Sequence, residues 1–169
     1  MTKRLFVLRH AKSSWDDPRA DDHDRPLAPR GHRAVKLLAE HLAANDIHPQ
    51  QVLCSTARRA QETLQGVAPG GERLIEHELY SAGSDEILER LRRVPPSIES
   101  VMVIGHNPAV QMLVLRLATD GDGSFLSDVQ DKFPTAALAT LTFDCAWSEL
   151  AAGCARLIAF VRPKTLGRI

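Results

Sequence analysis

Four short strand-like runs of the sequence each end in reactive or charged residues. The runs and the residues behind them are 5–8 with Arg9 and His10, 51–54 with Ser55, Arg58 and Arg59, 73–76 with His77 and Glu78, and 101–104 with Gly105 and His106. A neutral imidazole is a nucleophile at physiological pH, and a guanidinium binds two phosphate oxygens at once without losing its charge. Covalent phosphoryl transfer needs both kinds of group. The sequence therefore predicts a phosphate site.

These residues can meet only if the runs lie side by side in a sheet. Between and after the runs, the spacing of apolar residues and the turn residues predict further elements. These are helices over 31–45, 56–65, 84–93 and 108–117, and strands over 136–143 and 155–161. The alternation is typical of a largely parallel sheet with helices on both faces, a three-layer α/β/α arrangement. In such a sheet the carboxyl ends of the strands form the binding crevice.

The predicted helices and loops also have expected boundaries. Ser84 and Asn107 are the expected N-caps of the third and fourth helices. The polar stretch 12–30 and the Gly- and Asp-rich stretch 119–127 have no helical apolar face and are predicted to be loops. A loop as long as 12–30 tends to be functional.

Length and composition favour one soluble domain over residues 1–169. The chain has 44% hydrophobic and 25% charged residues, which is ordinary for a globular domain of this size. Lys plus Arg and Asp plus Glu number 21 each, so there is no net field to hold a polyanion. Nucleic acid is therefore not an expected partner. Separately, a monomer is favoured.

The cysteines and the N-terminus bear on location. Cys54, Cys145 and Cys154 show no metal-ligand spacing and are expected to be reduced thiols. The first apolar run is too short for a signal-peptide core, and no run approaches a membrane span. We therefore expect a cytoplasmic protein without a membrane partner, a metal or another cofactor.

Other chemistries fit the sequence less well. The acidic cluster 21–24 matches no calcium or zinc signature, so a solvated loop is expected there. Ser55 stands in no Gly-x-Ser-x-Gly elbow and is expected to shape the turn between strand and helix. The absence of a glycine-rich Walker loop argues against an ATPase.

Four motifs in order resemble the histidine phosphatase superfamily, also called the phosphoglycerate-mutase-like fold. They are the Arg-His segment 8–15, Arg25-Pro26-Leu27 with Gly31, the segment 55–63 with its Arg-Ala-x-x-Thr pattern, and Gly105-His106-Asn107-Pro108. The resemblance covers almost the whole chain. The short Arg-His-Ala-Lys-Ser opening and the compact chain are similar to the SixA-type phosphohistidine phosphatases.

The resemblance implies a role for each matched residue. His10 would be the nucleophile that becomes phosphorylated, and His106 would be the second histidine that contacts the phosphate. Arg9 and Arg59 would hold the phosphoryl oxygens; Arg59 is preferred over Arg58 because it directly precedes the matched alanine. Ser13, in the opening segment, is a further candidate for substrate binding.

A proton donor is the least defined part of this site. Alkyl phosphate esters need a general acid, and in much of the superfamily a carboxylate follows the third strand. Glu78 stands near that place, although the surrounding pattern departs from the family's. A phosphohistidine would depend less on the acid, because imidazole departs more readily than an alkoxide.

Several functions are compatible with these residues. The preferred one is hydrolysis of a protein phosphohistidine through phospho-His10, without a metal ion. A small-molecule phosphomonoesterase of the same superfamily is an alternative, with a phosphorylated metabolite as substrate. A catalytically weak phosphoprotein-binding module is a second alternative, and a metal-dependent phosphohydrolase is a more distant one.

Overall fold

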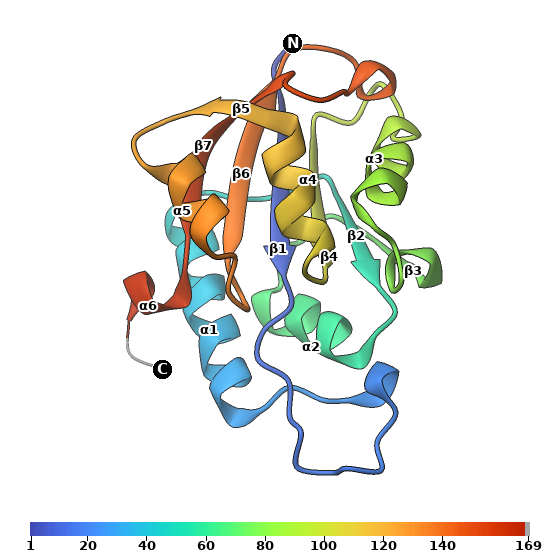
Figure 1. Cartoon of the computed structure of the whole chain (residues 1–169), viewed down its shortest axis with the longest axis vertical. Helices are drawn as coiled ribbons and strands as arrows, with labels where there is room; N and C mark the ends of the chain where they lie inside the picture. The colour runs from blue at the N-terminus through green and yellow to red at the C-terminus, as the bar shows by residue number, and fades with distance from the viewer. Residues whose placement is uncertain (168–169) are drawn as a thin grey trace.

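Seven strands form one sheet in the order β3-β2-β4-β1-β6-β7-β5 in the computed structural model, which describes residues 1–167 (Figure 1). The strands are β1 (Lys3–Arg9), β2 (Gln51–Ser55), β3 (Glu72–Glu76), β4 (Ser100–Gly105), β5 (Ala118–Gly121), β6 (Leu138–Phe143) and β7 (Ala155–Val161). Neighbouring β3, β2, β4 and β1 are parallel, β6 is antiparallel to β1 and β7, and β5 is parallel to β7. The predicted largely parallel sheet is confirmed.

Helices cover both faces of this sheet. They are α1 (Pro29–Ala44), α2 (Arg58–Val67), α3 (Ser84–Arg92), α4 (Ala109–Leu117), α5 (Phe125–Asp131) and α6 (Pro163–Leu166), with 3-10 turns η1 (Asp22–Asp24), η2 (His77–Leu79) and η3 (Trp147–Glu149). Successive side chains of a strand point to opposite faces. Leu5 and Val7 of β1 therefore join the core under α3, α4 and α5, whereas Phe6 and Leu8 join the core under α1 and α2. The three-layer arrangement is confirmed (Figure 1).

The first helix holds the segment that leaves β1. Of its predicted apolar stripe, Ala34, Leu38 and Leu42 are buried and Leu37 is partly buried. The fully buried Leu38 alone contributes about 2 kcal/mol through the hydrophobic effect. The helix begins at Pro29, earlier than predicted, because proline fits the first helical position. A Cβ atom on Gly31 would lie 2.3 Å from the carbonyl oxygen of Lys12. Glycine at this position lets α1 approach the backbone directly after the first strand.

The stretch 119–127 is not a loop throughout, contrary to the prediction. Residues Ala118–Gly121 form β5 at the edge of the sheet, where they pair with β7. Phe125–Asp131 then form α5, which buries Val129. Asp and Gly have low intrinsic strand preference, so here the pairing with β7 and not the local sequence decides the conformation.

Both predicted N-caps are displaced by one residue. Gly83 occupies the cap position of α3, so Ser84 is already the first helical residue. Pro108 occupies the cap position of α4, and the amide of Asn107 instead donates a hydrogen bond to the carbonyl of Phe133 at 3.2 Å. Asn107 thereby connects the end of β4 with the segment before β6.

Within residues 1–167, no helix is both long enough and apolar enough to cross a membrane.

Candidate active site

The carboxyl ends of β1, β4 and β2 bring the predicted site residues together. Arg9 pairs in register with Gly105, so His10 and His106 follow at neighbouring strand ends. Their ring centroids lie 5.1 Å apart. On the other side of β4, strand β2 ends at Ser55 and leads into α2, whose first turn carries Arg59.

His10 is held in one orientation and is uncharged. It is only 7% exposed, and its Nδ1 lies 2.8 Å from the carbonyl oxygen of Ala11. Since a carbonyl only accepts, we assign the proton to Nδ1, which leaves the lone pair on Nε2. Burial lowers the pKa of His10 to about 3, although the hydrogen bond to Ala11 acts in the opposite direction. A neutral ring with a free Nε2 is a competent nucleophile.

The backbone beside His10 is fixed by α2. The amide of Ala11 donates to Oγ1 of Thr63 at 2.9 Å, and the Thr63 hydroxyl donates to the carbonyl of Arg59 at 2.7 Å. Thr63 is completely buried, so this connection is shielded from water. It joins the backbone beside His10 to the backbone of Arg59 through a single side chain.

His106 is oriented by two polar partners. Its Nδ1 accepts a hydrogen bond from Nη2 of Arg59 at 3.4 Å, which leaves Nε2–H to donate to Oγ of Ser55 at 2.8 Å. The same Oγ accepts the amide hydrogen of Ala57 at 3.1 Å, as expected for a residue that shapes the strand–helix turn. Burial and then the charge of Arg59 lower the pKa of His106 to about 4. Both histidines are therefore neutral at physiological pH.

The two arginines supply the positive charge of the site. Burial and the charge of Arg59 lower the pKa of Arg9, which reflects the proximity of the two guanidinium groups. Nη1 of Arg9 donates to the carbonyl of Phe133 at 3.0 Å, and Arg59 is only 8% exposed. Two like charges held close together favour an anion between them.

Asp22 and Tyr80 also belong to the site, although the sequence did not point to them. Nη1 of Arg59 donates to the backbone carbonyl of Asp22 at 2.7 Å, and Nη2 donates to its carboxylate at 3.0 Å. The Tyr80 hydroxyl donates to the same carboxylate oxygen at 2.6 Å, and its ring meets His106 edge-on. The hydrogen bond from Tyr80 and then Arg59 lower the pKa of Asp22. The cluster 21–24 is thus only partly the solvated loop that was expected.

Glu78 lies in a different environment from the four matched residues. Its carboxylate is 3.2 Å from Nη2 of Arg93, directly after α3, and 3.9 Å from Nε of Arg90 on α3. Within residues 1–167, it shares no hydrogen bond with His10 or His106.

Ser13 and Arg58 have positions that differ from those of the four matched residues. The backbone of Ser13 forms an isolated bridge with Leu27, which closes the base of the loop between them. The exposed Arg58 donates to Glu62 at 3.2 Å, as an ordinary surface residue of α2 would. The structure therefore gathers His10, Arg9, Arg59 and His106, with Ser13 at the foot of the adjoining loop.

Residues 1–167 contain no group of three or more His, Cys, Asp or Glu side chains that could hold a metal ion. The charged groups that converge on His10 are arginines.

Comparison with known proteins defines the family. Residues 5–82 match the model of the histidine phosphatase superfamily (branch 1). An uncharacterized protein of Mycobacterium tuberculosis is 37% identical over 159 residues, which cover 93% of this chain and 100% of that protein. The chain belongs to the histidine phosphatase superfamily.

Within the superfamily, the similarity is to SixA proteins. The phosphohistidine phosphatase SixA of Escherichia coli K12 is 28% identical over 148 residues, covering 83% of this chain and 86% of that protein. A solved structure from Nakamurella multipartitia, described as a candidate phosphohistidine phosphatase SixA, superimposes with a TM-score of 0.83 at 29% identity. The match covers 96% of this chain and 97% of that one. These relatives support a phosphatase activity.

Proposed function

We propose that this protein is a phosphatase that acts through a phosphohistidine intermediate on His10, and that its substrate is a protein phosphohistidine. The observation that carries the proposal is the state of His10. Its Nδ1–H is engaged by the Ala11 carbonyl at 2.8 Å, and its neutral Nε2 remains available beside two guanidinium groups. This is the arrangement that attack on phosphorus requires.

In the first step, the lone pair of His10 Nε2 forms a bond to phosphorus while the bond from phosphorus to the leaving atom breaks. The leaving group keeps the electron pair and takes a proton from water. Arg9 and Arg59 stabilise the charge that spreads over the non-bridging oxygens. In the second step, a water oxygen attacks phosphorus, the bond to Nε2 breaks, the electron pair returns to His10, and the proton of the water passes to solvent.

The carboxylates near the site favour a phosphohistidine substrate. The lowered pKa of Asp22 keeps this group ionised at neutral pH, and Glu78 forms ion pairs with Arg90 and Arg93. Neither is poised to protonate a leaving alkoxide. An imidazole needs less assistance because it is a better leaving group, and the similar SixA protein of E. coli is named as a phosphohistidine phosphatase.

We further propose that the reaction needs no metal ion and takes place in the cytoplasm. The charge of Arg9 and Arg59 supplies the electrostatic stabilisation that a divalent cation provides in other phosphatases.

The test compares a phosphohistidine peptide and an aryl phosphate as substrates in the presence of a chelator. We expect the wild-type protein to release phosphate from the peptide and the His10→Ala variant to be inactive. His32→Ala, which removes an exposed histidine of α1, is the control and should retain activity. Acid-labile phosphate should be trapped on the wild-type chain. Equal activity of wild type and His10→Ala would overturn the proposal, and turnover of the aryl phosphate alone would assign the protein to the phosphomonoesterases.

A further inference from the structure

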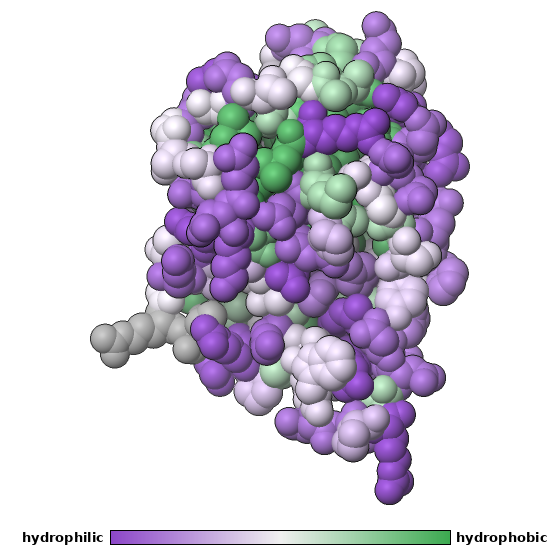
Figure 2. All heavy atoms as spheres, viewed as in Figure 1, coloured by the Kyte–Doolittle hydropathy of each residue, from purple (hydrophilic) through white to green (hydrophobic). Residues whose placement is uncertain are grey.

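A second, strongly basic pocket adjoins the phosphate site. It has a volume of about 430 Å³ and lies where the start of α1, the segment between α5 and β6, and the end of β7 with α6 meet. Six cationic side chains and one carboxylate line it, namely Arg9, Lys12, Arg30, Lys132, Arg162, Lys164 and Asp131. Hydrophilic side chains cover much of the lower half of the face that Figure 2 shows.

The charge of this pocket is not balanced by the protein. The whole chain is neutral by formal charge, so the six cations and one carboxylate of the pocket form a local excess of positive charge. Within residues 1–167, none of the six forms an ion pair with an acidic side chain, whereas Arg59, Arg90 and Arg156 do so elsewhere. Like charges gathered without counter-charges repel one another unless an anion binds among them.

Two guanidinium groups of the pocket also have unused donors. Nε of Arg9 and Nε of Arg162 are buried and have no hydrogen-bond partner within the described residues. Arg162 lies against Phe160, with its guanidinium carbon 5.6 Å from the ring centroid, so its position is defined by packing. A buried donor without a partner is costly in free energy, and the positive charge of its guanidinium group attracts an oxyanion to the pocket.

Arg9 joins the pocket to the reaction centre. It precedes His10 in the chain, and the nearby charge of Arg59 lowers its pKa. Its side chain also lines the basic pocket. Its Nη1 donates to the carbonyl of Phe133, which fixes the neighbouring Lys132 and Pro134 at the rim. A single substrate can therefore reach both places.

We propose that this pocket binds a second oxyanion of the substrate, a carboxylate or phosphate, while the phosphoryl group to be transferred lies at His10. The inference rests on the proposed function for the identity of the reacting group. It adds that the substrate is polyanionic: either a phosphohistidine flanked by acidic residues or a small molecule with a further phosphate.

The binding test uses orthophosphate and tripolyphosphate as probes in calorimetric titrations. We expect tripolyphosphate to bind wild type about tenfold more tightly, since two or three partly exposed ion pairs add up to that order of magnitude. The double variant Lys132→Gln/Lys164→Gln removes two exposed charges of the pocket and should reduce the difference to about twofold. Arg33→Gln/Lys36→Gln removes two exposed charges of α1 outside the pocket and should preserve it. Equal affinities in wild type, or the same difference in both double variants, would overturn the inference.

The source of the second oxyanion is resolved with two phosphohistidine peptides, one followed by three glutamates and one by three glutamines. A kcat/KM for the glutamate peptide about ten times that for the glutamine peptide, with a smaller ratio in Lys132→Gln/Lys164→Gln, would identify acidic residues of a protein as the source. A ratio near one, with the tripolyphosphate difference intact, would identify a second phosphate of a small molecule. Tripolyphosphate discrimination without hydrolysis of either peptide would refute the proposed phosphohistidine substrate and leave the pocket established. Equal hydrolysis of the two peptides, together with equal affinities for tripolyphosphate and orthophosphate, would refute only the pocket.

Discussion

The carboxylate of Asp22 lies 3.0 Å from Nη2 of Arg59, the same nitrogen that donates a hydrogen bond to His106. The contact orients Arg59, but it also places a negative charge beside the predicted position of the phosphoryl group. Tyr80 shares the same oxygen and holds the carboxylate in place.

Replacing Asp22 with Asn should tighten phosphate binding. Asn keeps an oxygen for Arg59 and Tyr80 but removes the charge that repels the phosphate dianion. We expect the inhibition constant for inorganic phosphate to fall about threefold, the size typical of one partly exposed charge interaction. Asp24→Asn, at an exposed neighbouring position, is the control. Weaker phosphate binding in Asp22→Asn would mean that the orientation of Arg59 matters more than the repulsion.

Removing the Ser55 hydroxyl should loosen His106. In Ser55→Ala, Nε2–H of His106 and the amide of Ala57 both lose their acceptor in a fully buried place. We expect a loss of about 1–3 kcal/mol in the free energy of unfolding and a decrease in kcat/KM of about tenfold. Ser100→Ala deletes a hydroxyl that accepts the Gln50 amide far from the site. It should affect stability alone, and a comparable loss of kcat/KM in this control would contradict the positioning role.

Thr63→Val tests the connection between the backbone beside His10 and α2. The change keeps the shape of the side chain but leaves the Ala11 amide without an acceptor, which costs about 1–3 kcal/mol of stability. Urea unfolding should detect the loss, and Thr63→Ser should restore most of it because the hydroxyl returns. If Thr63→Ser were as unstable as Thr63→Val, packing of the methyl group and not the hydrogen bond would be decisive.

The two site histidines should make the fold sensitive to mild acid. Their pKa values in the folded chain, about 3 for His10 and about 4 for His106, are below the ordinary value of about 6.5. Below pH 6.5 the unfolded chain binds protons that the folded chain does not, so the stability present above this pH declines as the pH falls toward 4.

The measurement is the free energy of unfolding in urea at pH 7, 6 and 5. The acidic side chains also titrate toward the lower end of this range, so wild type is compared with His106→Asn. The variant should lose less stability between pH 7 and 5, by about 2 kcal/mol. Identical pH dependence would show that His106 titrates normally in the folded protein.

The meeting of His10 and His106 could be predicted from sequence because it follows from sheet geometry. Each histidine stands directly behind an apolar run, and parallel neighbouring strands end at the same edge. The motif around Arg59 added the third strand end. The same rule was applied to the third run, but β3 is the edge strand of the sheet, and the carboxylate of Glu78 behind it pairs with Arg93.

Asp22 and Tyr80 could not be predicted in the same way. Asp22 is 37 residues from Arg59 in the chain and lies in a polar loop without periodicity. Its position depends on how the loop folds back toward its own base. The Ser13–Leu27 bridge fixes that base, and Glu62 accepts a hydrogen bond from the Leu27 amide at 2.7 Å. These are contacts between distant elements that no local pattern encodes.

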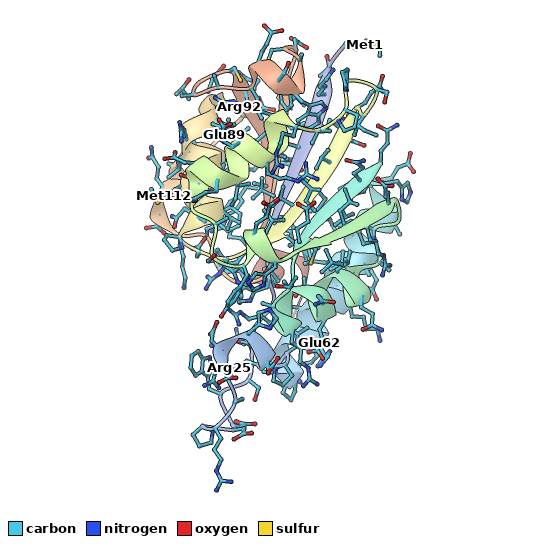
Figure 3. All side chains as sticks on the ribbon, turned by 90° about the vertical axis from the view of Figure 1, so that its right-hand side faces the viewer. Met1, Arg25, Glu62, Glu89, Arg92 and Met112 are labelled. Carbon is cyan, nitrogen blue, oxygen red and sulfur yellow. The ribbon has the colours of Figure 1, made fainter. Side chains whose placement is uncertain are left out.

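The closure of that loop at its base has a consequence for the evolution of specificity. The loop projects from the body of the protein, with Arg25 near its root and Glu62 on the adjacent α2 (Figure 3). Its exposed tip, residues 16–19, lies beyond the Ser13–Leu27 bridge. Doubling the length of such a loop costs only about 0.6 kcal/mol in closure entropy. Insertions at the tip can therefore reshape the entrance while the strand ends, and the chemistry they carry, are inherited unchanged.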